Sequence, residues 1–270
     1  MISVKKWTLL WIVVKVYFRC TKITINKNKN KNKKESHMKW LNTFTATALL
    51  CMSIPTLAEI GPWELEAHDK DNDIQVFTRT VESSSLKEFK GVTYIKADVA
   101  AFVALLLDTE MTTSWMHNVI EFKVVDAPSD TESLIYTVNK TPWPITDRDV
   151  YIRSVISADK LGTVTSSFIA EPDFAKKNEG FIRMPELIGT WVFTPMEDGM
   201  VEVSYQVHAN PGGSLPDWMV NAIVVETPLK TLLNLREVVT NEKYQNRSFA
   251  FIDKALATDQ ELAVEQSLMK

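Results

Sequence analysis

The sequence contains little cysteine, and all of it lies near the N-terminus. Its two cysteines, Cys20 and Cys51, both precede residue 59. Residues 59–270 therefore hold no disulfide, no thiolate nucleophile and no cysteine metal site. A chain without thiols is also compatible with an oxidising compartment.

The signatures of catalysis are missing as well. The sequence has no Walker loop, no nucleophile elbow and no dinucleotide fingerprint. The histidines after residue 58 are His68, His117 and His208, and they lack the spacing of metal ligands. We therefore expect no metal site, no cofactor and no catalytic residues, and a protein that is not an enzyme.

Positive charge is scarce in the larger part of the chain. Residues 1–58 hold 11 of the 30 Lys and Arg but one of the 34 Asp and Glu, so residues 59–270 carry 19 basic and 33 acidic side chains, a net charge of −14. Nucleic-acid binding requires a basic footprint. We therefore expect no nucleic acid among the partners.

The basic N-terminal part ends in the pattern of a secretory signal. Met38 and Lys39 form a short positive region, residues 40–54 are mostly apolar, and Thr56 and Ala58 place small side chains before a cleavage site. The apolar stretch, at roughly 15 residues, is shorter than the ~20 that span a bilayer. We predict a signal peptide at residues 38–58, cleavage after Ala58, and a secreted, periplasmic protein.

Residues 1–37 have an unusual composition, with Asn and Lys alternating over residues 26–34. Such a low-complexity run has no apolar side chain to bury. One interpretation is a basic tail for nucleic acid or membrane behind a short anchor. The other is a non-native extension upstream of a true start at Met38, which is favoured because a signal peptide works only near a real N-terminus.

Residues 59–245 are predicted to form one domain in which many strands precede a long helix. Alternating apolar and polar residues predict strands at 74–81, 86–97, 119–126, 132–140, 148–159, 162–170, 181–196 and 200–209. Helices are expected at 98–107, 109–115 and 217–244, and a weaker helical tail at 246–270. A long antiparallel sheet has one face to bury, and the last helix is its available cover. The fold class is therefore α+β, and an internal cavity is a natural outcome.

Five stretches of this domain resemble START domains, the lipid-transfer domains related to the steroidogenic acute regulatory protein. TPWPITDRDV at residues 141–150 resembles the family signature pWPlsdRD. SWM at 114–116, GFIR at 180–183, WVFTP at 191–195 and NPGGSLPDW at 210–218 resemble further family stretches in the same order. Two departures are Met116 and Asn210, at positions where the family often carries aspartate.

The resemblance implies a helix-grip fold, in which a curved antiparallel sheet surrounds a long C-terminal helix and encloses an apolar tunnel for one lipid. It implies a protein that binds a lipid or other hydrophobic small molecule and carries it in the periplasm, with transient contact at a membrane surface. Two alternatives stay open: a cyclase- or hydrolase-like enzyme acting on an apolar substrate in the same cavity, and a ligand-sensing or partner-binding module. The oligomeric state is also open.

The residues expected to form the site fall into three groups. The expected cavity residues are Trp115, Tyr136, Trp143, Arg153, Phe168, Arg183, Trp191, Phe193, Tyr205, Val207, Trp218, Met219 and Ile223. The expected gate residues are Phe174, in the loop 171–178 and followed by two lysines, and Leu215. The expected structural residues of the motifs are Pro144, Arg148, Asp149, Gly212 and Gly213.

Strand geometry constrains some of these roles. Neighbouring residues of a strand point to opposite faces, so Arg148 and Asp149 cannot both line a cavity. By the same rule, Tyr205 points inward together with Val203 and Val207. Arg153 and Arg183 are candidates for partly buried cations, and such a cation needs an acidic partner or a ligand oxygen.

Overall fold

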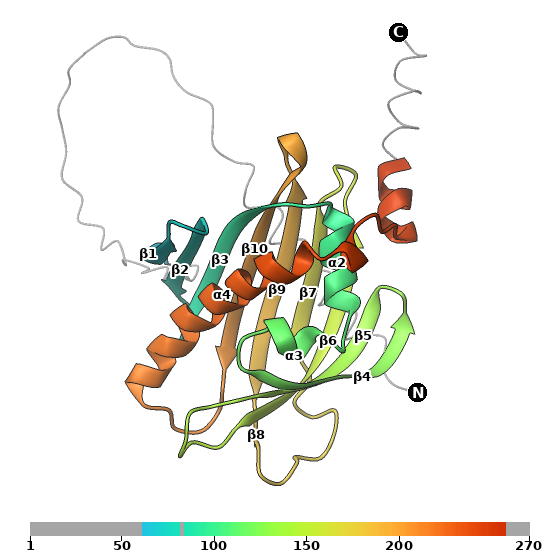
Figure 1. Cartoon of the computed structure of the whole chain (residues 1–270). Helices are drawn as coiled ribbons and strands as arrows, with labels where there is room; N and C mark the ends of the chain where they lie inside the picture. The colour runs from blue at the N-terminus through green and yellow to red at the C-terminus, as the bar shows by residue number, and fades with distance from the viewer. Residues whose placement is uncertain (1–60, 82–83, 258–270) are drawn as a thin grey trace, which may run out of the picture. The chain divides into compact units, whose positions relative to one another are not determined.

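The computed structural model describes residues 61–81 and 84–257. The predicted N-terminal extension, signal peptide and cleavage site lie outside the described residues, as does the chain after residue 257. The described part is an antiparallel sheet with helices on one face (Figure 1). In chain order its elements are β1 (Glu64–Asp69), β2 (Ile74–Thr80), β3 (Lys87–Lys96), α2 (Val99–Leu107), α3 (Thr112–Trp115), β4 (Val119–Ser129), β5 (Glu132–Asn139), β6 (Arg148–Ala158), β7 (Val164–Ala170), β8 (Ile182–Arg183), β9 (Glu186–Pro195), η1 (Glu197–Gly199), β10 (Met200–Asn210), α4 (Asp217–Val239) and η2 (Glu242–Tyr244).

The strands pair in the order β1-β2-β3-β10-β9-β7-β6-β5-β4, and every pair along this path is antiparallel. The short strand β8 lies off the path and pairs in parallel with the start of β6. The sheet curves around the helices, and α4 crosses it diagonally in Figure 1. This is the α+β helix-grip arrangement expected from the sequence.

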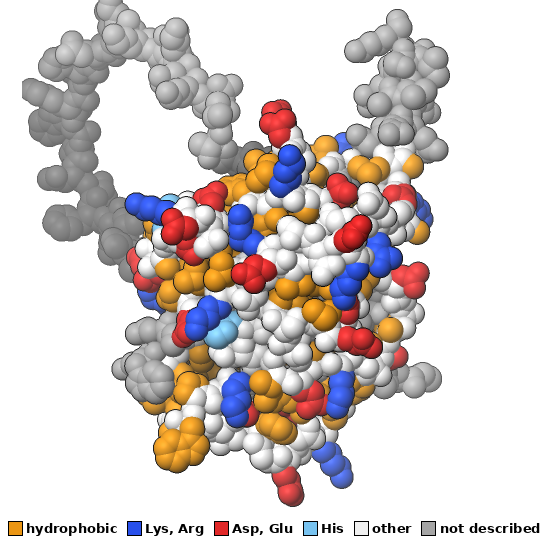
Figure 2. Space-filling model, in the orientation of Figure 1, with side chains coloured by type: hydrophobic (Ala, Val, Ile, Leu, Met, Phe, Trp, Pro, Cys, Tyr) orange, Lys and Arg blue, Asp and Glu red, His pale blue; other side chains and the backbone are white. Residues whose placement is uncertain are grey.

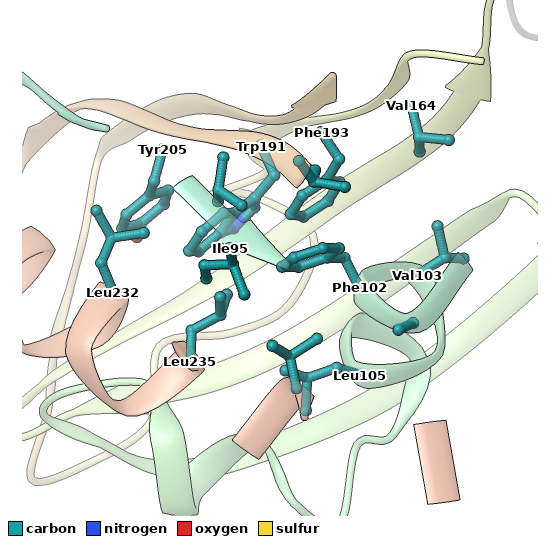
Figure 3. Close-up of a cluster of buried hydrophobic side chains, with 14 of the residues drawn as sticks. Ile95, Phe102, Val103, Leu105, Val164, Trp191, Phe193, Tyr205, Leu232 and Leu235 are labelled. Carbon is teal, nitrogen blue, oxygen red and sulfur yellow. The ribbon is translucent and has the colours of Figure 1, made fainter. Parts of the chain in front are cut away.

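The two faces of the sheet differ in what covers them. We call the face that carries the helices the inner face and the opposite one the outer face. The inner face includes Val203, Tyr205 and Val207 of β10 and Trp191 and Phe193 of β9, all buried in one hydrophobic cluster. The predicted inward stripe of β10 is therefore confirmed. Figure 3 shows Trp191 and Phe193 facing the side chains of α2 and α4.

The helices are held on the inner face by apolar packing. Every residue of α2 is apolar, and Phe102 stacks on Phe193 with ring centroids 4.9 Å apart. The helix α4 packs on β2 and β3 and contacts α2 and α3. Its approach to β3 requires glycine, because a Cβ on Gly91 would lie 2.6 Å from Leu232 Cδ1. Burial of this apolar surface stabilises the fold by ~25 cal/mol per Å².

The structure differs from the predicted elements in four places. Strand β1 was not expected, because its sequence is mostly polar and it forms an exposed edge of the sheet. The strand expected at 181–196 is divided into β8 and β9, with Pro185, which has no N–H for a ladder hydrogen bond, between them. Strand β4 continues to Ser129 through the expected turn, and α4 ends at Val239. The tail agrees with its prediction within the described residues, because residues 250–257 are helical.

Two features are absent from the part of the chain that the structure describes. No helix among them is long and apolar enough to cross a membrane. No group of three or more His, Cys, Asp or Glu side chains among them is arranged to hold a metal ion.

Candidate functional site

A band of buried hydroxyl groups crosses the inner face. Tyr205 of β10 pairs in register with Trp191 of β9, which pairs with Ser166 of β7. The Ser166 hydroxyl lies 3.3 Å from the Ser154 hydroxyl of β6. Residues in register on antiparallel strands share a face, so this band spans four strands of the inner face. Ser154, Ser166 and Tyr205 are all buried.

Tyr205 is buried without a hydrogen-bond partner among the described residues. Its ring stacks on Trp191 at a centroid distance of 3.9 Å and meets Phe89 edge-on at 5.3 Å. Burial raises the pKa of the Tyr205 hydroxyl, so the phenol is neutral and able to donate a hydrogen bond at physiological pH. In Figure 3 the side chain lies beside Leu232 of α4.

Trp115, at the end of α3, covers the same region. It is 1% exposed, and its ring meets Trp191 edge-on with centroids 5.8 Å apart. Its indole Nε1 is buried and has no hydrogen-bond partner within the described structure. Asn234 of α4 donates a hydrogen bond to the Trp115 carbonyl (3.0 Å), which fixes α3 beneath α4. Thr137 Oγ1, on the inner face of β5, is another buried polar atom without a hydrogen-bond partner among the described residues.

Six of the predicted cavity residues lie in or against the inner hydrophobic cluster. Trp115, Phe168, Trp191, Phe193, Tyr205 and Val207 belong to the inner cluster or pack against it. Met219 of α4 is buried, and Ile223 on the same helix is half-buried. The side chain of Trp218 lies outside what the structure describes.

Tyr136 and Arg183 were expected in the cavity, but the structure places them on the outer face. Arg183 forms a bidentate ion pair with Asp149 (Nε–Oδ1 3.0 Å, Nη2–Oδ2 2.8 Å), and both side chains are 1% exposed. The Tyr136 hydroxyl donates to Asp149 Oδ2 at 3.4 Å and accepts from Asn178 Nδ2 at 2.9 Å. The hydrogen bond to Asp149 raises the pKa of the Arg183 guanidinium. The members of this network bond to one another on the outer face, so they are not placed to donate to a ligand on the inner face.

Arg153 is also on the outer face. It pairs in register with Leu134 and Ile169, which share a face with Tyr136 rather than with Tyr205. Its guanidinium binds Glu171 (Nε–Oε1 2.5 Å) and Glu132 (Nη1–Oε1 2.9 Å). The hydrogen bond to Glu171 raises the pKa of Arg153. The acidic partner that this arginine was expected to need is therefore present, but on the outer face.

Phe174, an expected gate residue, lies over the outer face as well. Its ring packs against Tyr151 with centroids 5.1 Å apart. The loop that carries it is fastened by Arg183, whose Nη1 donates to the carbonyls of Pro172 (3.0 Å) and Ala175 (3.2 Å). A loop tied down by a buried guanidinium on the outer face is not placed to open the interior on the other face.

Trp143 was expected to line the cavity, but its side chain is 93% exposed. It lies in the loop between β5 and β6, before Pro144, with which it forms a cis peptide bond. The base of the loop is fixed by Thr141, whose Oγ1 donates to the carbonyls of Ile145 and Thr146, both at 2.9 Å. The rigid base and the exposed tip present Trp143 to the surroundings.

Arg148 connects this loop to the start of α4. Its Nη1 donates to the Thr146 carbonyl (2.5 Å), and its Nε and Nη2 donate to the carbonyls of Pro211 (3.4 Å) and Gly212 (3.3 Å). Gly212 and Gly213 both have positive φ, 68° and 66°, which favours glycine. Burial lowers the pKa of Arg148. Leu215, the second expected gate residue, is half-buried in the loop before α4.

Tyr205, Arg153 and His208, which an enzyme acting in the same cavity would need close together, lie on different faces of the sheet. Tyr205 belongs to the inner face, whereas the outer face carries Arg153 and His208, the latter one position further along β10 than inward-facing Val207. His208 Nδ1 is buried and has no partner among the described residues.

The polar residues of the inner face were missed from the sequence. Ser154 alternates with Ile152 and Ile156, and Ser166 alternates with Val164 and Phe168. The alternation of side chains along a strand places both serines on the apolar face, so this pattern was the signal in the sequence that could have identified them.

The curved sheet, its C-terminal helix and the mixed inner face define a helix-grip protein. The family model described as START domain matches residues 56–243. The chain belongs to the START domain family, as its motifs predicted. An uncharacterized protein of Pseudomonas aeruginosa is 38% identical over 194 residues, which cover 72% of this chain and 94% of that protein.

Two further relatives carry lipid-transfer names. The crystal structure of the STAR-related lipid transfer protein of Xanthomonas axonopodis (fragment 25–204) is 38% identical, with a TM-score of 0.61, covering 66% of this chain and 99% of that one. The phosphatidylcholine transfer protein of Mus musculus is 25% identical over 154 residues, which cover 55% of this chain and 71% of that protein.

Proposed function

We propose that this protein binds one lipid or other hydrophobic molecule between the inner face and α4, and transfers it between membranes. The observation that carries the proposal is the buried indole Nε1 of Trp115, which has no hydrogen-bond partner among the described residues although the ring lies in the apolar cluster of the inner face. A buried donor normally has a partner, and an acceptor oxygen of a bound molecule would supply one.

Family membership and the names of two relatives support this reading. The START family and the lipid-transfer titles of the Xanthomonas and mouse proteins agree with an apolar ligand. Tyr205, a buried residue whose hydroxyl makes no hydrogen bond to the described residues, also favours a ligand beside Trp115.

We place the membrane contact at Trp143 rather than at the loop of Phe174. An exposed tryptophan at a loop tip suits the interface of a bilayer, where its ring is apolar and its N–H remains hydrated. Figure 2 shows acidic, basic and hydrophobic side chains interspersed over the face that α4 covers. Contact through one aromatic loop therefore needs no large basic patch. The predicted signal peptide at residues 38–58 supports a periplasmic location for this transfer.

A matched pair of substitutions on β6 tests ligand binding in the interior. Ser154→Phe places a large ring on the inner face, and Val155→Phe places the same ring on the outer face, where Val155 is 44% exposed. We expect Ser154→Phe to slow transfer of a fluorescent lipid between vesicles by about tenfold or more, because the ring fills space that the ligand needs. Val155→Phe is expected to transfer at the wild-type rate.

Circular dichroism and thermal unfolding of both variants show whether either has lost its fold. Equal transfer by folded Ser154→Phe and wild type would contradict binding on the inner face. Wild-type protein that neither binds nor transfers any fluorescent lipid would contradict the proposed function itself.

A further inference from the structure

We infer that the ligand of the inner face presents an uncharged hydrogen-bonding group, which Tyr205, Trp115 and Ser166 bind. This inference rests on the proposed function and narrows it to lipids whose polar group is a hydroxyl, ester or amide, without phosphate or carboxylate. The inner face carries buried polar atoms, and the described inward-facing residues around them on β6, β7, β9 and β10 bear no charge.

The first observation is that two donors are buried close to one ring and are unused. Trp191 is stacked on one side by Tyr205 (3.9 Å) and met edge-on by Trp115 (5.8 Å). Tyr205 and Trp115 are 7% and 1% exposed. The indole N–H of Trp115 is buried without a partner among the described residues, and the Tyr205 hydroxyl makes no hydrogen bond to them. An indole N–H can only donate, so whatever satisfies it must be an acceptor. An oxygen of the ligand meets that requirement.

The second observation is that the band continues as neutral hydroxyls. Ser166 is in register with Trp191, and its hydroxyl contacts that of Ser154. Each serine hydroxyl can donate and accept, so the pair retains capacity for a further bond. The band therefore offers both donors and acceptors, which suits a hydroxyl or an amide.

The third observation concerns charge. Between Val150 and Ala158 of β6, and along the inner sides of β7, β9 and β10, the described inward-facing residues are apolar or hydroxyl-bearing. A phosphate or carboxylate there would lose its hydration without gaining a counter-ion, which is far more costly than burying a neutral polar group.

The two guanidinium groups nearest to this face are already engaged. Arg148 lies six residues from Ser154 along β6, about 20 Å at 3.3 Å per residue, and is held by three carbonyls. Arg236 of α4 donates from Nη1 to Thr93 Oγ1 (2.8 Å) and to the Tyr94 carbonyl (2.7 Å) at β3. Both guanidinium groups are thus bonded to oxygens of the protein, and neither has a hydrogen bond to Tyr205, Ser154 or Ser166.

The test compares three probes that carry the same fluorescent acyl chain: a diacylglycerol, a phosphatidylcholine and the free fatty acid. Equilibrium binding to the purified protein is measured for each. We expect the diacylglycerol to bind about tenfold or more tightly than either charged probe. A phosphatidylcholine that binds as well as the diacylglycerol would overturn the inference, and so would a preference for the fatty acid, which would instead point to Arg236.

Variants locate the contact. Tyr205→Phe and Trp115→Phe remove one donor each and keep an aromatic ring, and each should weaken diacylglycerol binding about 3- to 10-fold, the effect of one lost hydrogen bond. Tyr151→Phe is the matched control, because Tyr151 lies on the outer face against Phe174 and Arg183. Unchanged affinity in both test variants, with folding verified by circular dichroism, would contradict the assignment.

These outcomes separate the inference from the proposed function. If all three probes bind with similar affinity, the protein binds lipids but does not select an uncharged group, and only the inference fails. If none binds, the proposed function fails and the inference fails with it.

Discussion

On the outer face of the sheet, Asp149 and Arg183 are buried as a bidentate pair, and Tyr136 and Asn178 donate to the Asp149 carboxylate. On the inner face, Tyr205 is buried among apolar rings, and its hydroxyl makes no hydrogen bond to the described residues. The outer face thus uses its polar groups to fasten a loop. The inner face leaves the Trp115 indole N–H and the Thr137 hydroxyl without partners among the described residues. This difference separates scaffold from site more clearly than residue type does, since both faces carry tyrosines.

The largest expected effect comes from breaking the outer network. Arg183→Met leaves the Asp149 carboxylate buried without a cation, and removes the bonds to the carbonyls of Pro172 and Ala175. We expect a loss of about 3–5 kcal/mol in the free energy of unfolding, measured by urea denaturation. Lys230→Met is the control, since its ion pair with Glu226 is exposed, and it should cost less than about 0.5 kcal/mol. Similar losses in the two variants would show that the pair is not structural.

An intermediate effect is expected from alkali, acting on the inner face. Burial raises the pKa of Tyr205, so the folded state holds this proton more tightly than the unfolded chain does. The resulting stability is complete below the unfolded pKa of about 10 and is lost as pH rises above it, with a slope approaching about 1.4 kcal/mol per pH unit. Tyr205→Phe removes this loss, while the other tyrosines titrate equally in both proteins. Urea denaturation at pH 9 to 11 measures the two slopes, and identical slopes would contradict the buried, unpartnered state of Tyr205.

The smallest effect comes from the same substitution on opposite faces at neutral pH. Tyr136→Phe removes a hydroxyl that bonds to Asn178 and Asp149, and should cost about 1 kcal/mol. Tyr205→Phe removes a hydroxyl without a partner and should leave stability within about 0.5 kcal/mol of the wild type, or raise it. Thermal unfolding of both variants provides the comparison. A larger loss for Tyr205→Phe would mean that its hydroxyl has a structural partner.

Most of the fold could be predicted from the sequence, because the strands alternate clearly and five family motifs occur in order. Strand β1 could not, since Glu64–Asp69 offers only Leu65 and Ala67 as apolar residues and both belong to an edge strand. Such a strand is defined by the partner it pairs with rather than by its own pattern.

The site was harder to predict than the fold. The alternation of side chains along a strand shows which residues share a face, but it does not show which of the two faces is the inner one. On β10 one face is apolar, so the direction of Tyr205 was predicted correctly. On β5, Leu134 and Ile135 point to opposite faces, and both faces are covered in part, the outer one by the loop that carries Phe174. Tyr136 therefore looked like a cavity residue. The exposure of Trp143 could not be predicted for a different reason. Trp143 lies in a loop, and a loop has no regular alternation of side chains from which burial could be inferred.

Arg148 gives two distant parts of the chain a single anchor. Its guanidinium holds the Thr146 carbonyl, at the base of the loop that exposes Trp143, together with the carbonyls of Pro211 and Gly212, just before α4. Hydrogen bonds from a charged donor contribute roughly 1.5–3 kcal/mol each. Separating the two segments would forfeit at least one of them, so displacement of the loop and displacement of the helix are thermodynamically linked events. A displacement of the loop that carries Trp143 would therefore be transmitted through the Arg148 side chain to the segment that leads into α4.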